Sequence, residues 1–141
     1  MTTFEVALSG DFRLADGSPA YPSFDLGPLK SDPRINVRYV DAVDGTIPGA
    51  ALEDVDALIL LVPRFGPRSV PKSGRLSVVA RFGVGFDSVD VPTCTANDIA
   101  LVTTPDGVRR PVAVAILTFI LALAGKLMVK DQLVRRGPDG W

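Results

Sequence analysis

The feature that most constrains the fold is a continuous apolar run, Ala57–Val62, near the middle of the chain. A strand that is apolar at every position must be covered on both faces, which is typical of a central strand in a parallel sheet. Four shorter apolar or alternating runs are separated by connectors long enough for crossovers. The pattern predicts an α/β fold with an open parallel five-stranded sheet and flanking helices. The other expected strands are residues 4–8, 35–40, 76–80 and 99–102.

The last third of the chain has a different pattern. Residues 112–124 are apolar except for Thr118, and a more amphipathic stretch continues to Arg136 before Gly137 and Pro138. This predicts one long helix or two helices in tandem. A helix that is apolar on all sides needs another surface to cover it, so we expect a homodimer through the 112–136 helix. The apolar stretch is shorter than the ~20 residues of a bilayer span, which argues against a membrane.

Composition excludes several classes of function. The 141 residues suit about one domain, and a net charge of −1 argues against nucleic acid as a partner. With one cysteine, Cys94, and no N-terminal secretory pattern, the chain is expected to be cytoplasmic. It contains no histidine, so no imidazole base, acid or metal ligand can come from these residues. We therefore expect no metal site and no histidine-dependent catalysis in this chain.

The segment Arg81–Asp90 has the sequence RFGVGFDSVD and follows an expected strand. Its two glycines allow tight turns, and successive backbone N–H groups in such a turn can bind a carboxylate or phosphate. Two other interpretations stay open. The Gly-x-Gly pattern, with Asp106 about twenty residues on, also fits a dinucleotide fingerprint, although Ser88 replaces its third glycine. The second alternative interpretation is a tight turn that binds no ligand.

These motifs together resemble a known family. The pattern Arg-x-Gly-x-Gly-x-Asp-x-Val-Asp, then Ile99–Asp106 and the long helix, is similar to the N-terminal part of the D-isomer-specific 2-hydroxyacid dehydrogenases. The likeness also extends upstream through Ile47–Ile59. It implies a flavodoxin-like substrate domain over residues 1–108. In the family, a helix like that of residues 109–141 enters a nucleotide-binding domain and builds the dimer.

The resemblance also implies site residues. The backbone N–H groups of Val84 and Gly85 match those that hold the substrate carboxylate in the family. Gly83 would permit the turn together with Gly85, Asp87 would brace it, and Asp90 would cap the next helix. Arg64 is a candidate substrate-binding residue, because a guanidinium binds anions through several donors. Arg109 is a candidate cofactor contact.

Some positions depart from the family pattern. Val114 and Ile116 stand where the family usually has Glu and Thr, and Leu61 and Val62 replace polar or basic residues after the third strand. Asp98 replaces a customary glycine at a helix end, a position where an Asp tolerates left-handed geometry.

The resemblance predicts an NAD- or NADP-dependent oxidoreductase that acts on a small 2-hydroxy or 2-keto acid. The catalytic Arg, Glu and His of the family, with most cofactor contacts, lie beyond the part that this chain resembles. The chain thus looks like a truncated member that binds no cofactor tightly and is inactive alone. The alternatives are a stand-alone dimeric interaction module on an α/β scaffold and a small flavodoxin-like nucleotide binder.

Overall fold

The computed structural model describes residues 3–140, which form two compact units, one ending at Thr104 and the other beginning at Pro105. The first unit ends a few residues before position 108 because the long helix of the second unit already begins at Asp106.

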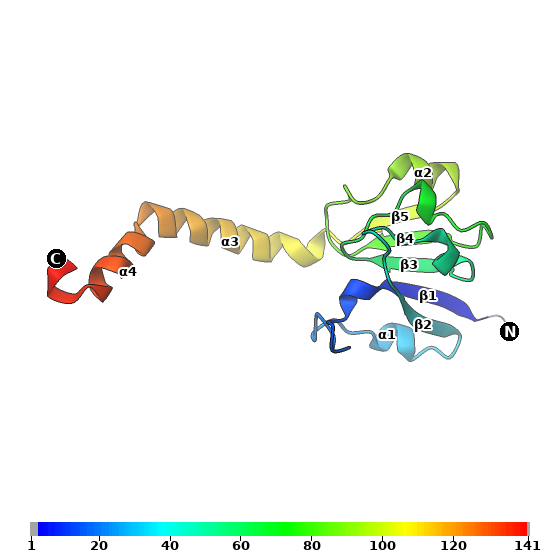
Figure 1. Cartoon of the computed structure of the whole chain (residues 1–141), viewed down its shortest axis with the longest axis horizontal. Helices are drawn as coiled ribbons and strands as arrows, with labels where there is room; N and C mark the ends of the chain where they lie inside the picture. The colour runs from blue at the N-terminus through cyan, green and yellow to red at the C-terminus, as the bar shows by residue number, and fades with distance from the viewer. Residues whose placement is uncertain (1–2, 141) are drawn as a thin grey trace. The chain divides into compact units, whose positions relative to one another are not determined.

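A five-stranded sheet forms the first unit (Figure 1). All neighbouring strands are parallel, in the order β2-β1-β3-β4-β5, so β3 is central as its apolar run predicts. This is the flavodoxin-like strand order. The strands are β1 (Phe4–Ser9), β2 (Ile35–Val40), β3 (Ala57–Leu60), β4 (Val78–Arg81) and β5 (Ala100–Thr103).

Two hydrophobic clusters cover opposite faces of the sheet. Leu58, Leu60 and Val79 point to one face, where they pack with residues of the connectors that follow β2, β3 and β4. Val6 and Leu8 point to the other face and pack with Phe12 and the segment up to Leu29. Alternate side chains of a strand point to opposite faces, so both faces of β1 and β3 are covered, as a parallel sheet requires.

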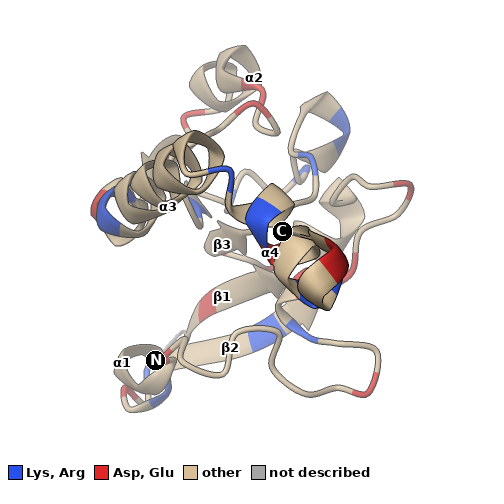
Figure 2. Ribbon diagram, turned by 90° about the vertical axis from the view of Figure 1, so that its left-hand side faces the viewer, with Lys and Arg blue, Asp and Glu red and all other residues tan. Residues whose placement is uncertain are grey.

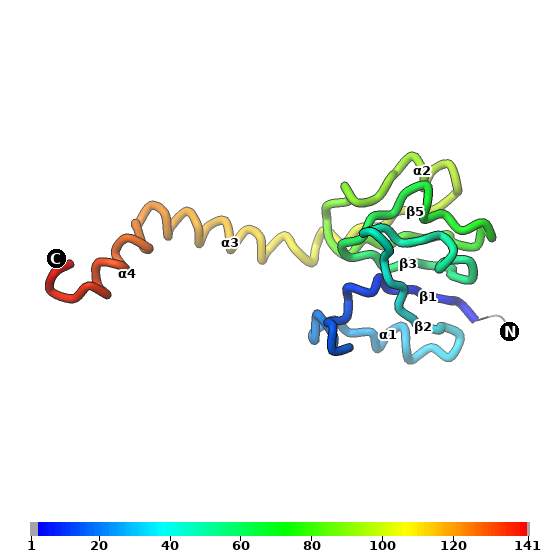
Figure 3. The backbone as a smooth tube through the Cα atoms, in the orientation of Figure 1, coloured from blue at the N-terminus to red at the C-terminus, as the bar shows by residue number. Residues whose placement is uncertain are grey.

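The connectors contain less helix than expected for βαβ units (Figure 3). Proline and glycine are frequent in them, and both residues shorten helices. The connector after β1 contains the short helix α1 (Gly27–Lys30), and the helix expected after the glycine loop is α2 (Val91–Ala96). The other connector helices are 3-10 helices: η1 (Gly10–Phe12), η2 (Gly49–Leu52) and η3 (Pro67–Ser69).

Two residues lie at the ends of α2 as the sequence predicts. The Asp90 side chain accepts a hydrogen bond from the Thr93 N–H at 2.7 Å and caps the start of α2. After α2, Asp98 has a φ of 55°, the left-handed conformation in which glycine is more common.

The second unit consists of tandem helices, α3 (Asp106–Ala124) and α4 (Leu127–Arg135), followed by the 3-10 helix η4 (Gly137–Gly140). The break falls at Lys126, whose φ is 51°. The Gly125 N–H still donates to the Leu121 carbonyl, which closes the last turn of α3. Charged residues occur in α3 only in its first turns, as Figure 2 shows.

The surface of α3 is unusual. By length and composition alone, the α3 helix is long and apolar enough to cross a membrane. None of its most apolar 18-residue stretch is buried in the structure. Leu121 and Leu123 are among its most exposed side chains. The helix is longer than the apolar run of residues 112–124, because it begins at Asp106 and passes through Pro111.

Candidate anion-binding site

The carboxyl ends of the parallel strands meet at one edge of the sheet, where open α/β folds bind their ligands. At this edge β4 ends at Arg81 and continues into the loop Phe82–Ser88. The Phe82 N–H donates to the Leu60 carbonyl at 2.8 Å, so the loop starts next to the end of β3.

The loop is fixed to the end of β5 by Gly83. Its N–H donates to Thr104 Oγ1 at 2.8 Å, and its carbonyl accepts from the Thr104 N–H at 2.9 Å. The φ of Gly83 is 140°, which L residues rarely adopt, and a Cβ there would overlap the Arg81 guanidinium. Gly83 is therefore required by the turn itself.

The next two backbone amides are free. Among the described residues, neither the Val84 N–H nor the Gly85 N–H has a hydrogen-bond partner, and both residues are exposed. Adjacent unpaired amides on a braced loop can bind an oxyanion. Gly85 does not have a positive φ, which corrects the expectation that both glycines serve the turn. The nearest atom to a Cβ at Gly85 is Asp87 Oδ2 at 3.6 Å, so that side of Gly85 is open.

Arg81 is a site residue that sequence reasoning missed. Its guanidinium lies against Gly83 and donates to the Phe82 carbonyl, while its Nε is buried without a partner. It places a positive charge beside Gly83, the residue that precedes the two free amides. The signal was present in the sequence, because Arg81 is the basic residue immediately before the loop.

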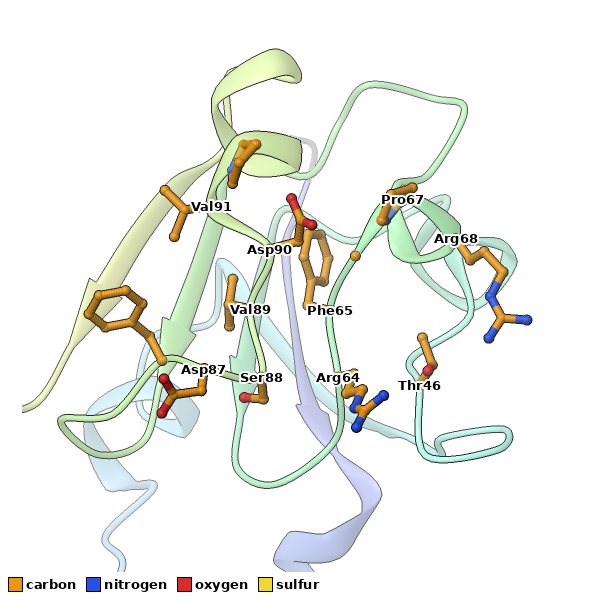
Figure 4. Close-up of a pocket in the computed structure, with 13 residues that line it drawn as sticks. Thr46, Arg64, Phe65, Pro67, Arg68, Asp87, Ser88, Val89, Asp90 and Val91 are labelled. Atoms are coloured by element: carbon orange, nitrogen blue, oxygen red, sulfur yellow. The ribbon is translucent and has the colours of Figure 1, made fainter.

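Arg64 lines a cavity that is separate from the free amides of the loop. A cavity of about 600 Å³ is lined by Arg64, Arg68 and Thr46 on one side and by the segment Phe86–Pro92 on the other (Figure 4). The residues Gly83, Val84 and Gly85 do not line it. The cavity begins at Phe86 and Asp87, where the loop ends. The structure thus brings Arg64 near the end of the loop but not into one cavity with the free amides.

Backbone pairing explains where Arg64 lies. Its N–H donates to the Gly45 carbonyl, and the Phe65 N–H donates to the Ser88 carbonyl, both at 2.8 Å. The chain after β3 therefore runs between two other connectors, the one after β2, which contains Gly45, and the one after β4, which contains Ser88. Asp87, which was expected to brace the loop, makes no hydrogen bond to it in the described structure and lines the cavity instead.

The chain directly after β3 is held by two side chains from the end of β1. Ser9 Oγ accepts from the Leu61 N–H at 3.0 Å, and Asp11 Oδ2 accepts from the Val62 N–H at 2.9 Å. These bonds occupy the amides at the point between β1 and β3 where the strand order reverses. These two amides are therefore not free to bind a ligand, unlike the Val84 and Gly85 amides of the loop after β4.

The residues of the second unit do not form a dinucleotide site. Arg109 is exposed and lies 3.2 Å from Asp106 in an ion pair within the first turn of α3. The described residues 105–140 are helical and contain no strand, so they lack the strand, glycine turn and helix that hold a dinucleotide pyrophosphate.

Metal and thiol chemistry find no support in the described residues. Residues 3–140 hold no group of three or more histidine, cysteine or acidic side chains that could bind a metal. Cys94 is buried in α2, and burial raises the pKa of its thiol, which makes it less reactive.

The fold defines an open α/β domain whose sheet carries two free backbone amides at its carboxyl edge. Family comparison makes the assignment specific. A model of the catalytic domain of D-isomer specific 2-hydroxyacid dehydrogenases matches residues 23–115, more than half of the chain. The chain belongs to this family of oxidoreductases.

Curated relatives are similar over part of their length. A glyoxylate reductase from Thermococcus gammatolerans is 36% identical over 87 residues, which are 61% of this chain and 26% of the relative. A D-3-phosphoglycerate dehydrogenase from Mycobacterium leprae is 31% identical over 103 residues, 72% of this chain and 20% of the relative. The chain thus spans about a quarter of the length of these relatives or less.

Solved structures share the fold. The TT0316 protein from Thermus thermophilus has a TM-score of 0.71 at 21% identity, with 95% of this chain and 41% of that chain covered. A D-lactate dehydrogenase from Aquifex aeolicus, complexed with NAD and lactic acid, has a TM-score of 0.69 at 20% identity, with 93% of this chain and 37% of that chain covered.

Proposed function

We propose that residues 3–104 are the substrate-binding domain of an NAD- or NADP-dependent D-2-hydroxyacid dehydrogenase. The observation that carries the proposal is the pair of free N–H groups at Val84 and Gly85, on a loop braced by Thr104. They would hold the carboxylate of a small 2-hydroxy or 2-keto acid, with the Arg81 guanidinium adding positive charge. Family membership and the NAD-bound relative of similar fold support this assignment.

The reaction divides between this chain and other groups. Reduction of a 2-keto acid needs a hydride, which the nicotinamide supplies when bound, and a proton for the new hydroxyl group. The chain contains no histidine, and its described residues 105–140 contain no strand for a dinucleotide-binding unit, so an imidazole proton donor and the cofactor domain would come from elsewhere. The role of this chain is to bind and orient the acid. We expect no turnover of NADH and pyruvate by the 141-residue protein, and turnover would contradict the proposal.

The test is a titration of the 141-residue protein with pyruvate, followed by amide NMR shifts. The Val84 and Gly85 amides should shift most, because they would donate to the carboxylate. A ligand of six heavy atoms should bind weakly, with a Kd on the order of 1 mM. If these two amides do not respond at concentrations well above that value, the proposed function is wrong.

A pair of glycine variants separates binding from stability. Gly83→Ala should abolish the shifts at Val84 and Gly85, because it strains the loop and displaces the Arg81 guanidinium. Gly74→Ala is the control: Gly74 has a φ of 66° and open space around it, on the connector before β4. Both variants should lose about 1 kcal/mol of stability to backbone strain, but Gly74→Ala should bind pyruvate normally. Equal binding by both variants would show that the loop is not the site.

A second candidate function, dimerisation through residues 112–136, is favoured by the exposed apolar surface of α3. Such a surface on one helix is larger than a soluble monomer usually leaves open. Ile120→Asp should convert a dimer into a monomer in analytical ultracentrifugation, since it places a charge within the apolar surface. Val43→Asp, at an exposed apolar residue of the first unit, should leave the dimer intact. A monomeric parent protein, or one that partitions into lipid vesicles, would contradict dimerisation through α3.

A further inference from the structure

A further cavity lies between the connector that follows β1 and strand β2. Its volume is about 280 Å³, which is close to the lower end of the range for ligand pockets. Four aromatic side chains line it, and we call it the aromatic pocket: Phe12, Tyr21, Phe24 and Tyr39. Neither the loop after β4 nor Arg64 lines this pocket, so it is separate from the free amides and from the larger cavity.

The aromatic rings of the pocket are held by contacts with one another and with Arg13. Phe12 is buried, and its ring stacks on the Phe24 ring at a centroid distance of 5.2 Å. It also meets the Tyr21 ring edge-on at 6.3 Å, and the Arg13 guanidinium lies 4.3 Å over the Tyr39 ring. Close packing normally leaves few voids larger than a water molecule between such side chains. An open cavity among four aromatic rings therefore favours a ligand that itself carries a flat ring.

Two side chains of opposite charge line the same pocket, Asp25 just before α1 and Lys30 at its last residue. The Asp25 Oδ1 atom accepts from the Gly27 N–H at 2.7 Å, which orients the carboxylate. Within residues 3–140, neither Asp25 nor Lys30 forms an ion pair, and Lys30 makes no side-chain hydrogen bond. The pocket therefore offers one negative and one positive group to a ligand whose ring lies among the aromatic side chains.

We propose that the aromatic pocket binds an aromatic amino acid, with its ring among the four rings, its ammonium group at Asp25 and its carboxylate at Lys30. This orientation gives each charge of the ligand one partner of opposite sign. An aromatic acid without an ammonium group would leave Asp25 without a partner, and a second carboxylate or a phosphate would be repelled by it. The site is independent of the proposed function, because it uses none of the residues that would hold the 2-keto acid.

Amide NMR titration of the 141-residue protein with L-phenylalanine tests the site. The amides of Tyr21, Phe24, Lys30 and Tyr39 should shift, with a Kd on the order of 1 mM for a ligand of this size. L-Alanine is the control ligand, because it carries the same two charges and no ring. It should leave these four amides unchanged at the same concentrations.

Two related ligands and two substitutions test the recognition of each charge. 3-Phenylpropionate lacks the ammonium group and phenethylamine lacks the carboxylate, so each should bind about fivefold more weakly than L-phenylalanine. Asp25→Asn, which keeps an acceptor for the Gly27 N–H, should weaken L-phenylalanine about fivefold without weakening 3-phenylpropionate. Lys30→Met should likewise weaken L-phenylalanine without weakening phenethylamine.

Lys72→Met is the matched control for Lys30→Met. Lys72 is also an exposed lysine of the first unit, and it does not line the aromatic pocket. Its substitution should leave the affinities for all three aromatic ligands unchanged. Asp25 and Lys30 are exposed as well, so the fold should tolerate both substitutions, and an amide spectrum like that of the parent protein checks this.

The outcomes separate this proposal from the proposed function. If L-phenylalanine at concentrations well above 1 mM shifts none of the pocket amides, or shifts only Val84 and Gly85, the aromatic pocket is not its site and the proposal is wrong. If the three aromatic ligands bind equally, or if Lys30→Met behaves like Lys72→Met, the pocket does not recognise an amino acid. Pocket shifts that each substitution weakens selectively would support the proposal, even if pyruvate left Val84 and Gly85 unchanged and the proposed function failed.

Discussion

Phe82→Ala is expected to destabilise the first unit by about 3 kcal/mol and to release the anion-binding loop, because an aromatic truncation leaves a cavity. The Phe82 ring packs against Phe12, Phe24 and Tyr21, which all belong to the long connector between β1 and β2. That connector has little regular structure of its own, with only η1 and α1. The same ring thus fixes this connector and the residue that precedes Gly83.

Urea unfolding would measure the loss of stability, and amide hydrogen exchange would locate it. Exchange should accelerate most in residues 12–31 and in the loop after β4. Phe4→Ala is a matched control, because Phe4 is 44% exposed at the start of β1, and its truncation should cost less than 1 kcal/mol. Comparable losses for the two variants would show that the aromatic cluster does not carry this stability.

The strands were predictable from the sequence because each is an apolar or alternating run bounded by polar or turn residues. The run of residues 57–62 predicted a central strand, and β3 is central. Its end was not predictable, because Leu61 and Val62 are as apolar as the residues before them. They leave the sheet because Ser9 and Asp11, some fifty residues earlier, bind their amides.

The connectors show a second limit of sequence reasoning. Their lengths are compatible with helices, yet the structure forms mostly turns and 3-10 helices there. Closely spaced Pro and Gly residues prevent long helices in the connectors. Individual side chains from the connectors, such as Ile47, Leu52 and Phe65, then cover the sheet. A length argument alone does not distinguish these two ways of covering a sheet.

The candidate site was predicted in part. Loop position and donor amides follow from local sequence, because glycines after a strand determine the backbone locally. The position of Arg64 could not be predicted from local sequence, because tertiary pairing directs the chain after β3 toward Gly45 and Ser88. Arg81 was missed because it lies within the strand, where a basic residue would usually be interpreted as a solvated edge position.

Asp56→Asn is expected to destabilise the first unit by about 2 kcal/mol at neutral pH, since it removes charge-assisted hydrogen bonds between segments distant in sequence. Asp56 Oδ1 accepts from Arg75 Nε at 2.7 Å, and its Oδ2 accepts from the Glu5 N–H at 2.7 Å. The carboxylate thus joins the start of β3 to β1 and to the connector before β4. This is the edge of the sheet opposite the loop, so ligand binding should be unchanged.

The pH dependence of the loss gives a sharper test. Hydrogen bonds from Arg75, and then from the Glu5 amide, hold the pKa of Asp56 below its ordinary value of 3.8, against the opposing effect of burial. A folded-state pKa below the unfolded one means that the group binds fewer protons when folded. Its stabilisation is therefore complete above about pH 4 and is lost as the pH falls through the folded pKa. The difference in unfolding free energy between parent and variant should accordingly shrink as the pH is lowered below 4.

Asp32→Asn is the control for this titration. Arg34 lowers the pKa of Asp32 to about 2, but the two residues are separated by one position and Arg34 is exposed. A contact between such close neighbours can persist in the unfolded chain, so it changes the difference between the two states less than the Asp56 contacts do. Asp32→Asn should thus change stability and its pH dependence less than Asp56→Asn. If the Asp56→Asn difference stayed constant from pH 7 to pH 2.5, the ion pair with Arg75 would not be a source of the stability of the fold.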